Sequence, residues 1–433
     1  KKGYYFSVLA PNATYVSVVG DFNDWNHEAH PLFVRLERSG IWEGFIPGLK
    51  EFENYKYHII GFEGVTLLKG DPFARHWETR PATSSKTKDI QYEWNDTTWM
   101  HKRINNNSLN SPWSIYEVHL GSWMKPVADD EFSVNSYDQM IGLLVPYVKK
   151  MGFTHVELMP VMEFPFDGSW GYQGTGYYAP TSRFGVPEDF MKLVEAFHKE
   201  DIGVILDWVP SHFPRDAHGL FMFDGTHTYE YADMRKGYHP EWNSYIFNYA
   251  RGEVRSFLIS NARYWFDLYH IDGMRVDAVS SMLRLDYSRE EGEWEPNEHG
   301  GNGNMEAIAF IRNLNEMVYR DFPDVQMIAE ESTDWPQITG LTTHGGLGFG
   351  MKWMMGWMQD TLDYFKVDPL YRKDNQNQFT FSLAYFYDEN FILPLSHDEV
   401  VHGKSPMLYK MPGDEWQKFA NLRTLYSYMY THP

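Results

Sequence analysis

Short apolar runs alternate with helical patterns throughout the chain after Pro112, and this repeat limits the possible folds more than any other feature. Helical patterns occur at 138–151, 187–200, 253–270, 305–322 and 415–430. The apolar runs read as seven strands, IYEVHL (115–120), THVELMPV (154–161), VILDWVP (204–210), GMRVDAV (273–279), VQMIAEES (325–332), FGMKWM (349–354) and FILPLSH (391–397). Repeated βα units predict an α/β fold with a parallel sheet, and eight such units close a TIM-type (β/α)8 barrel.

The eighth βα unit of such a barrel has no counterpart in the sequence. The last predicted strand is followed by a single helical run, which ends near Pro433. A sheet of seven strands would keep unpaired edges and an exposed interior. We therefore expect residues 113–433 to form a barrel that is truncated at its C-terminus. The natural protein is expected to be longer, and the absence of an initiator Met at Lys1 agrees with this.

The first hundred residues follow a different pattern. Alternating segments at 4–10, 14–20, 41–48 and 55–61 are separated by Asn, Gly and Pro, as in antiparallel strands joined by turns. We predict a small all-β, immunoglobulin-like sandwich over residues 1–95. The polar stretch 96–112 includes three consecutive asparagines and has little pattern, so we predict a linker there.

Charge and composition disfavour several classes of function. The net charge of −21 repels phosphate backbones and anionic membrane surfaces, so no nucleic-acid or membrane partner is expected. The chain has no cysteine and no run of about 18 apolar residues, which argues against disulfides, thiolate sites and membrane spans. We expect a cytoplasmic monomer.

Aromatic residues make up 17% of the chain. A large core explains most of them, but flat rings also stack on sugars. For Trp25 and Trp42 in the predicted sandwich, core packing is favoured over a sugar-binding surface.

Polar side chains interrupt the apolar runs near the ends of four predicted strands. They are Asp207 and the following His212 on the third strand, Arg275 and Asp277 on the fourth, Glu330 and Glu331 on the fifth, and His397 and Asp398 on the seventh. In a βα barrel the C-terminal ends of the strands converge on one face, where reactive groups gather. Four such strand ends are improbable by accident, so we expect these residues to share one site.

Arg275 and Asp277 are two residues apart on one strand, so both side chains are expected to face the mouth of the barrel. An arginine a few Å away would keep the aspartate ionised and therefore nucleophilic. The alternative for this pair is a buried structural ion pair. Adjacent strand residues point to opposite faces, so only one of Glu330 and Glu331 can aim inward, and periodicity leaves that choice open.

No cofactor motif accompanies this cluster. The sequence has no HExxH or CxxC for zinc, no GxGxxG or GxxxxGK[ST] for a nucleotide, and no GxSxG nucleophile elbow. We therefore expect neither a metal nor a cofactor. Carboxylates in an aromatic cleft suit attack on a glycosidic bond, in which one carboxylate attacks the anomeric carbon and another protonates the leaving oxygen.

At these positions the sequence resembles a known family. DWVPSHF (207–213), GMRVDAV (273–279), IAEES (328–332) and PLSHDEV (394–400) are similar to the four conserved motifs of the α-amylase superfamily, glycoside hydrolase family 13. The AEES and SHDEV variants, and the stretch 168–190, resemble bacterial-type glycogen branching enzymes in particular. GDFNDW (20–25) resembles the carbohydrate-binding sandwich that precedes their barrel, and the resemblance covers essentially the whole chain.

The resemblance implies a role for each site residue. Asp277 would be the nucleophile, Glu330 the general acid/base and Asp398 the stabiliser of the transition state. The residues that would bind the sugar or support the site are Tyr172, Asp207, His212, Arg275 and His397.

The resemblance also implies a retaining transfer, in which a chain of an α-1,4-glucan such as glycogen or amylose is cleaved and rejoined through an α-1,6 linkage. The carboxylate trio cannot separate transfer from hydrolysis. A debranching or trehalose-releasing hydrolase and a non-catalytic glucan-binding protein therefore stay as alternatives. The acidic loop 286–301 is predicted to lie beside the cleft as a solvated loop.

Overall fold

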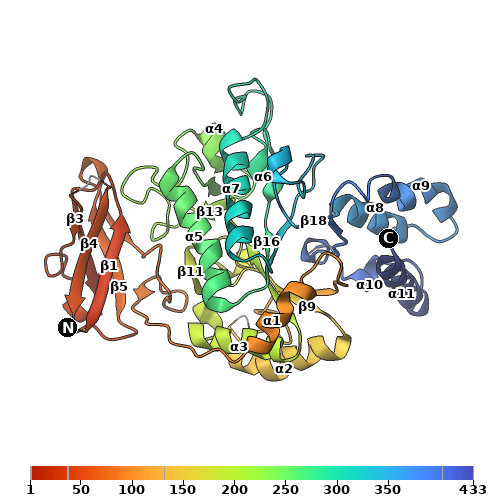
Figure 1. Ribbon diagram of the computed structural model, residues 1–433, viewed down its shortest axis with the longest axis horizontal. Helices are drawn as coiled ribbons and strands as arrows, with labels where there is room; N and C mark the ends of the chain where they lie inside the picture. Colours follow the sequence, from red (N-terminus) through yellow and green to blue (C-terminus); the bar gives the residue numbers. More distant parts are fainter. Residues whose placement is uncertain (1, 37–38, 131, 402, 433) are drawn as a thin grey trace.

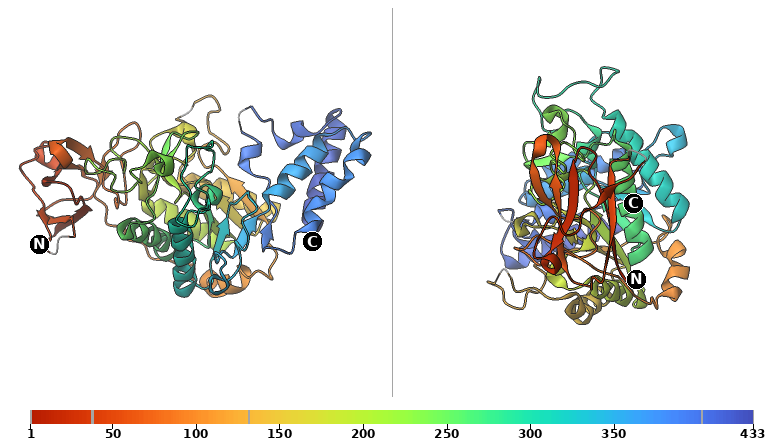
Figure 2. Two further views of the ribbon diagram at one scale, coloured as in Figure 1. Left: turned by 90° about the horizontal axis from the view of Figure 1, so that it is seen from above. Right: turned by 90° about the vertical axis from the view of Figure 1, so that its left-hand side faces the viewer.

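The computed structural model describes residues 2–36, 39–130, 132–401 and 403–432, which form an N-terminal β part, a central α/β part and a helical C-terminal part (Figure 1). The N-terminal strands lie at one end of the molecule and the C-terminal helices at the other, as Figure 2 also shows. None of the described helices is both long and apolar enough to cross a membrane.

Two small antiparallel sheets make up the N-terminal part. One holds β1 (Gly3–Leu9), β4 (Ile41–Pro47) and β3 (Phe33–Val34), and the other holds β2 (Tyr15–Gly20), β5 (Asn54–Ile60), β6 (Thr66–Lys69) and β7 (Ser85–Lys86). Alternate residues of β5, namely Tyr55, Tyr57 and Ile59, are buried, which is the pattern of a strand with one face in a core. The four strands predicted from the sequence are confirmed to within one residue at each end.

The two tryptophans of this part differ in burial. Trp42 is half-buried and its indole Nε1 donates to the carbonyl of Ala10. Trp25 is 40% exposed and its Nε1 donates to Asp21. Core packing is therefore wrong as a prediction for Trp25, because the turn that carries it has a positive φ of 59° and turns the ring outward to a local partner.

A seven-stranded parallel sheet forms the central part, and it contains all seven predicted strands. In order across the sheet these are β8 (Ile115–Val118), β9 (His155–Leu158), β12 (Gly203–Trp208), β16 (Gly273–Val276), β17 (Gln326–Ala329), β18 (Met351–Trp353) and β19 (Phe391–Ile392). Each strand pairs in parallel with the next one along the chain, as in the wall of a barrel. Among the described residues, β8 and β19 are the edges of this sheet.

The five predicted helices are present as α2 (Tyr137–Met151), α3 (Pro187–Lys199), α5 (Gly252–Tyr269), α7 (Met305–Asp321) and α11 (Glu415–Thr431). A further helix, α8 (Met355–Lys366), follows β18. Local signals explain their limits: α2 begins at a capping box of Ser136 and Gln139 and ends at Gly152, whose φ is +80°. Shorter elements lie in the loops, namely α4 (Met234–Gly237), α6 (Val279–Leu283), α9 (Gln376–Thr380), α10 (Met407–Lys410), β10 (Met162–Glu163), β11 (Gly176–Pro180), β13 (His212–Pro214), β14 (Tyr238–His239) and β15 (Ser244–Ile246).

The stretch 96–112, predicted to be a linker with little pattern, contains helix α1 (Thr97–Asn106). This helix covers the N-terminal end of the central strands. Its Trp99 is buried and donates from Nε1 to Asp272, 2.8 Å away, and Arg103 holds both oxygens of Asp324 at 2.8 Å. The helix was missed because its buried partners lie more than 160 residues away in sequence.

A buried cluster of Asp96, His198 and Asp272 joins this helix to the sheet. His198 Nδ1 lies 2.9 Å from Asp96 and its Nε2 lies 2.9 Å from Asp272, and the imidazole is fully buried. Burial by itself lowers the pKa of His198, but the two carboxylates outweigh it and the net pKa is raised. The pKa values of Asp96 and Asp272 are lowered by the same contacts, against burial.

We expect the His198→Ala variant to be destabilised by about 1.5–3 kcal/mol near pH 5.5, because it removes the hydrogen-bonded cation between two buried carboxylates. Asp96 keeps His270 at 2.9 Å and Asp272 keeps Arg103 at 3.8 Å. Because folding raises the pKa of His198, the protonated ring contributes its full stabilisation when the pH is below its pKa in the unfolded chain, which is about 6.5. This stabilisation is lost as the pH rises through the higher pKa of His198 in the folded protein. The destabilisation caused by His198→Ala should therefore be smaller at pH 9. Urea unfolding at the two pH values tests this, with the exposed His299→Ala as a matched control that changes stability by less than about 0.5 kcal/mol. An equal loss at both pH values would contradict the prediction.

Candidate active site

The predicted site residues lie at the C-terminal ends of the central strands. Asp207 lies in β12 and Arg275 in β16, and both are almost fully buried. Asp277 directly follows β16 and Glu330 directly follows β17. His397 and Asp398 begin a short 3-10 helix after β19, and Tyr172 lies in the loop between β10 and β11.

Arg275 lies between the carboxylates of this site. Its Nη1 donates to both oxygens of Asp207 at 2.9 Å and to Oδ1 of Asp277 at 2.7 Å. Its Nη2 is 4.0 Å from Oε2 of Glu330. The guanidinium also lies 4.4 Å from the centre of the Trp353 ring, so one face of the cation is covered by an aromatic side chain. The prediction that Arg275 and Asp277 share a face is confirmed.

Two of the carboxyl groups around Arg275, those of Asp277 and Glu330, have pKa values that are raised to near neutrality. Burial raises the pKa of Asp277 to about 6, with Arg275 opposing the shift and Asp207 adding to it. Burial raises the pKa of Glu330 to about 7, with Arg275 opposing and Asp277 adding. Both carboxyl groups therefore keep a proton to a higher pH than ordinary carboxyl groups do. Arg275 opposes the rise in the pKa of Asp277 but does not prevent it.

Glu330 and Glu331 have separate surroundings. Glu330 Oε2 accepts from the backbone N–H of Ala278 at 2.7 Å, and it lies on the side of Asp277 and Arg275. Glu331 is fully buried on the other side, where Oε2 accepts from Nζ of Lys352 at 2.7 Å. The structure thus directs Glu330 into the cleft and gives Glu331 a structural ion pair.

Tyr172 and His397 extend the network across the mouth of the barrel. The hydroxyl of Tyr172 donates to Asp207 at 2.6 Å and lies 3.2 Å from Nε2 of His397. The two rings are stacked, with centroids 5.4 Å apart and an angle of 16° between their planes. Nε2 of His397 is also 3.3 Å from Oδ1 of Asp398, whose side chain is 54% exposed.

His212 lies apart from this hydrogen-bonded group. Its ring is buried beside Trp242 and His239, with centroids 5.1 and 6.1 Å away, and burial lowers its pKa to about 4. Its Nδ1 has no hydrogen-bond partner among the described residues. The structure therefore places a neutral imidazole at this position, without a direct bond to the carboxylates.

Glu117 in β8 was not predicted from the sequence as a residue of the site, and it lies beside Glu157 of β9 in the ladder between these strands. Glu117 accepts from His397, and Glu157 is buried beside Glu117, Asp207 and Arg275, where burial raises its pKa well above the ordinary value. A charged residue within an apolar run is the same signal that identified the later strand ends. The same pattern is present in IYEVHL, which contains Glu117, and in THVELMPV, which contains Glu157.

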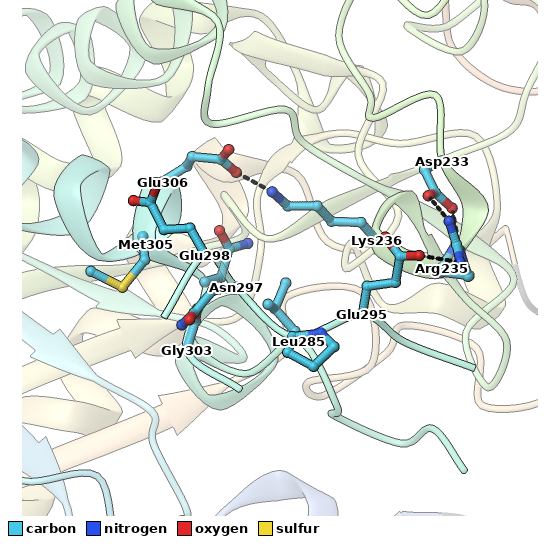
Figure 3. A pocket seen from close by; sticks show the side chains of 12 residues that line it. Asp233, Arg235, Lys236, Leu285, Glu295, Asn297, Glu298, Gly303, Met305 and Glu306 are labelled. Carbon is cyan, nitrogen blue, oxygen red and sulfur yellow. Dashed lines mark hydrogen bonds and ion pairs between the residues drawn. The ribbon is translucent and has the colours of Figure 1, made fainter. Parts of the chain in front are cut away.

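A cavity of about 370 Å³ lies away from these residues, between α4 and the acidic loop (Figure 3). Ion pairs of Arg235 with Glu295 and of Lys236 with Glu306 cross it. It contains none of the predicted site residues, and its side chains are paired with one another. Within the described ranges, no group of three or more His, Asp or Glu side chains is arranged to hold a metal ion.

Two known protein families match segments of the chain. Residues 1–74 match carbohydrate-binding module 48, described as the isoamylase N-terminal domain, and residues 140–240 match the alpha amylase catalytic domain. A crystal structure of a Salmonella typhimurium protein assigned as an alpha amylase shares the fold, with a TM-score of 0.64 and 21% identity over 88% of this chain and 57% of that one.

Curated relatives match the whole chain. It is 58% identical to the 1,4-alpha-glucan branching enzyme GlgB of Aquifex aeolicus, covering 100% of this chain and 68% of the relative. It is 55% identical to that of Thermosynechococcus vestitus and 54% to that of Synechocystis sp., again over 100% of this chain but over 59% and 58% of those relatives. The chain thus spans about three fifths of the length of several relatives that it matches.

The different surroundings of the two adjacent glutamates predict different effects on stability. Glu331→Gln should destabilise the protein by about 3–5 kcal/mol, because it leaves Lys352 buried without its counter-ion. Glu330→Gln should leave stability unchanged or slightly higher at pH 8, because ionising a group whose pKa is raised by folding costs stability.

Urea unfolding of both variants at pH 8 measures this difference. The double variant Glu331→Gln/Lys352→Met should recover part of the loss, because it removes the unpaired charge. Equal destabilisation by the two single substitutions would show that the glutamates are not separated as described.

Proposed function

Since this chain belongs to the family of 1,4-alpha-glucan branching enzymes, we propose that it cleaves α-1,4-glucan chains and rejoins them through α-1,6 linkages. The observation that carries this proposal is the arrangement of Asp277, Glu330 and Asp398 around Arg275 and His397 at the strand ends. Two carboxyl groups with separated pKa values supply a nucleophile and a proton donor, which is what cleavage of a glycosidic bond requires.

In the first step Asp277 attacks the anomeric carbon of the donor chain. The lower pKa of the two supports this assignment, because Asp277 is ionised when Glu330 still carries its proton. Glu330 protonates the departing oxygen, and a covalent glycosyl-enzyme forms. The carboxylate of Asp398 binds sugar hydroxyls and stabilises the developing oxocarbenium ion, the neighbouring hydrogen-bond donors hold the sugar in place, and Tyr172 stacks on the sugar at the cleavage point.

In the second step Glu330, now a carboxylate, removes a proton from the 6-hydroxyl of an acceptor glucose. That oxygen attacks the anomeric carbon and releases Asp277, so the configuration is retained and a branch is made. Transfer wins over hydrolysis when a bound acceptor hydroxyl has a large effective concentration. A cavity of about 600 Å³ beside Glu331 supports this explanation, because it has aromatic rings on which sugars can stack, namely Trp335, Trp353, Phe381 and Tyr385. One of these rings, Trp353, also contacts Arg275.

The finer features of the fold are proposed on the same basis. The domains run over residues 1–95 for an immunoglobulin-like sandwich that binds carbohydrate, 96–112 for the connection and 113–433 for the barrel. An eighth parallel strand between β19 and β8 completes the barrel in the active protein, and the two free edges of the sheet support this. The monomeric state and the cytoplasmic location stay predictions.

The activity should depend on pH as a bell-shaped curve. Asp277 must be ionised, so kcat/KM should fall as the pH drops below about 6, and Glu330 must be protonated, so it should fall as the pH rises above about 7. The two apparent pKa values of this curve belong to Asp277 and Glu330 as an interacting pair, and not to either residue alone. A pH profile of kcat/KM on amylose tests this, and the residual activity of Glu330→Gln should lose the alkaline limb. A profile that stays flat from pH 5 to 9 would contradict the assignment.

Incubation with amylose should separate transfer from hydrolysis. Transfer predicts that iodine staining falls with few new reducing ends and that α-1,6 signals appear in the proton NMR spectrum. Matching growth of reducing ends would instead indicate a hydrolase, and binding without turnover would indicate a glucan-binding protein. Asp277→Ala should lower kcat by about 10⁴-fold, and a variant that keeps a tenth of the activity would remove Asp277 from its role.

A further inference from the structure

The carboxylate of Glu117 holds His397 by two bonds. Oε2 accepts from the backbone N–H of His397 at 2.8 Å, and Oε1 lies 2.6 Å from its ring Nδ1. Glu117 belongs to β8 and His397 follows β19, so the contact joins the first and the last strand of the sheet across 280 residues of sequence. No backbone ladder joins these two strands among the described residues, so the position of His397 depends on this side chain.

The other ring nitrogen also faces acceptors. Nε2 of His397 lies 3.3 Å from Oδ1 of Asp398 and 3.2 Å from the hydroxyl of Tyr172. That hydroxyl already donates its proton to Asp207, so toward His397 its oxygen accepts. A carboxylate accepts hydrogen bonds and does not donate them. Both ring nitrogens of His397 therefore carry hydrogen, and the side chain is an imidazolium.

The charged groups around His397 come from β8, β12, β16 and the turn after β19. Glu117 in β8, Asp398 after β19 and Asp207 in β12 favour the charged ring, while Arg275 in β16 and burial oppose it. His119, next to the end of β8, is kept neutral because burial lowers its pKa to about 4. The net pKa of His397 is raised, which agrees with the hydrogen-bond geometry.

Glu157 is the neighbour of Glu117 in the ladder between β8 and β9, but it makes no bond to His397. Its Oε1 has no hydrogen-bond partner among the described residues, and burial raises its pKa well above the ordinary value. Glu157 thus leaves the contact with His397 to Glu117. It offers a matched control, because it has the same side chain in the same layer of the barrel.

We propose that Glu117 is a positioning residue, which fixes the ring of His397 as an imidazolium with its Nε2–H on the side of Tyr172, Asp398 and the bound glucan. This inference rests on the proposed function. The held ring supplies a charged donor at the cleavage point and keeps Asp398 in place, and Tyr172 links it through Asp207 to Arg275 and Asp277. Charge-assisted bonds of this kind are the strong ones.

The direct test is the pKa of His397 in the protein without substrate, measured from the histidine ring signals in NMR spectra. The signal is assigned as the one that disappears in His397→Asn. In Glu117→Gln the amide nitrogen that meets Nδ1 can only donate, so the ring must become neutral. Its pKa should therefore fall by at least about one unit, and Glu157→Gln should leave it unchanged. An unchanged value in Glu117→Gln, or an equal fall in Glu157→Gln, would overturn the proposal.

Kinetics on amylose then test whether Glu117 acts through His397. Glu117→Gln should lower kcat about 10- to 100-fold with little change in KM, and Glu157→Gln should stay within about threefold of the parent. The double variant Glu117→Gln/His397→Asn should be no slower than His397→Asn alone, because the two residues act as one unit. Additive losses would overturn the proposal.

Unfolding curves and the NMR measurement separate the other outcomes. If Glu117→Gln loses more than about 2 kcal/mol of stability, Glu117→Asp, which keeps the charge but not the reach, provides the second kinetic comparison. If the parent protein has no activity on amylose, the proposed function fails, while the pKa of His397 still decides whether Glu117 holds it as an imidazolium.

Discussion

The buried guanidinium of Arg275 is the interaction on which the site depends. It contacts Asp207 at 2.9 Å and Asp277 at 2.7 Å while it is 1% exposed. Carboxylates that are buried close together repel one another, so more than one of them can ionise only with a cation between them. The sheet provides the necessary rigidity, because Asp207 and Arg275 are direct partners in the ladder between β12 and β16. Burial raises the pKa of both the acid and the nucleophile, and this cation opposes the rise in each of them.

The two ends of the sheet use the same residue types for opposite purposes. At the N-terminal end, Asp272 accepts hydrogen bonds from Trp99, His198 and the N–H of Val204, and its pKa is lowered although it is fully buried. At the C-terminal end, Glu330 accepts one backbone hydrogen bond, and its pKa is raised to about 7. The number of donors that offset burial decides the direction of the shift. The first arrangement stabilises the fold, and the second keeps a proton available.

Much of this architecture could be predicted from local patterns. The seven strands and five of the long helices follow from periodicity. Apolar residues that face the core recur every two residues in a strand and every three to four residues in a helix. Polar residues at four strand ends identified most of the site. Helix α1 and the exposure of Trp25 could not be predicted in this way, because α1 is held by Asp272 and Asp324 from distant strands and Trp25 by a local turn. Glu117 and Glu157 are each a charged residue within an apolar run, which is the same pattern that predicted the site residues of the later strands.

The sequence by itself determined the order of the βα units, the residues at the strand ends and, through the four motifs, the family. Only the tertiary structure decided that Glu331 pairs with Lys352 while Glu330 faces the cleft, and that Glu117 holds His397. Only the structure also placed the pKa of Glu330 above that of Asp277. The physical reason is that a pKa depends on desolvation and on charges within a few Å. Those charges come from strands that are up to 280 residues apart in the chain and meet only when the sheet has formed.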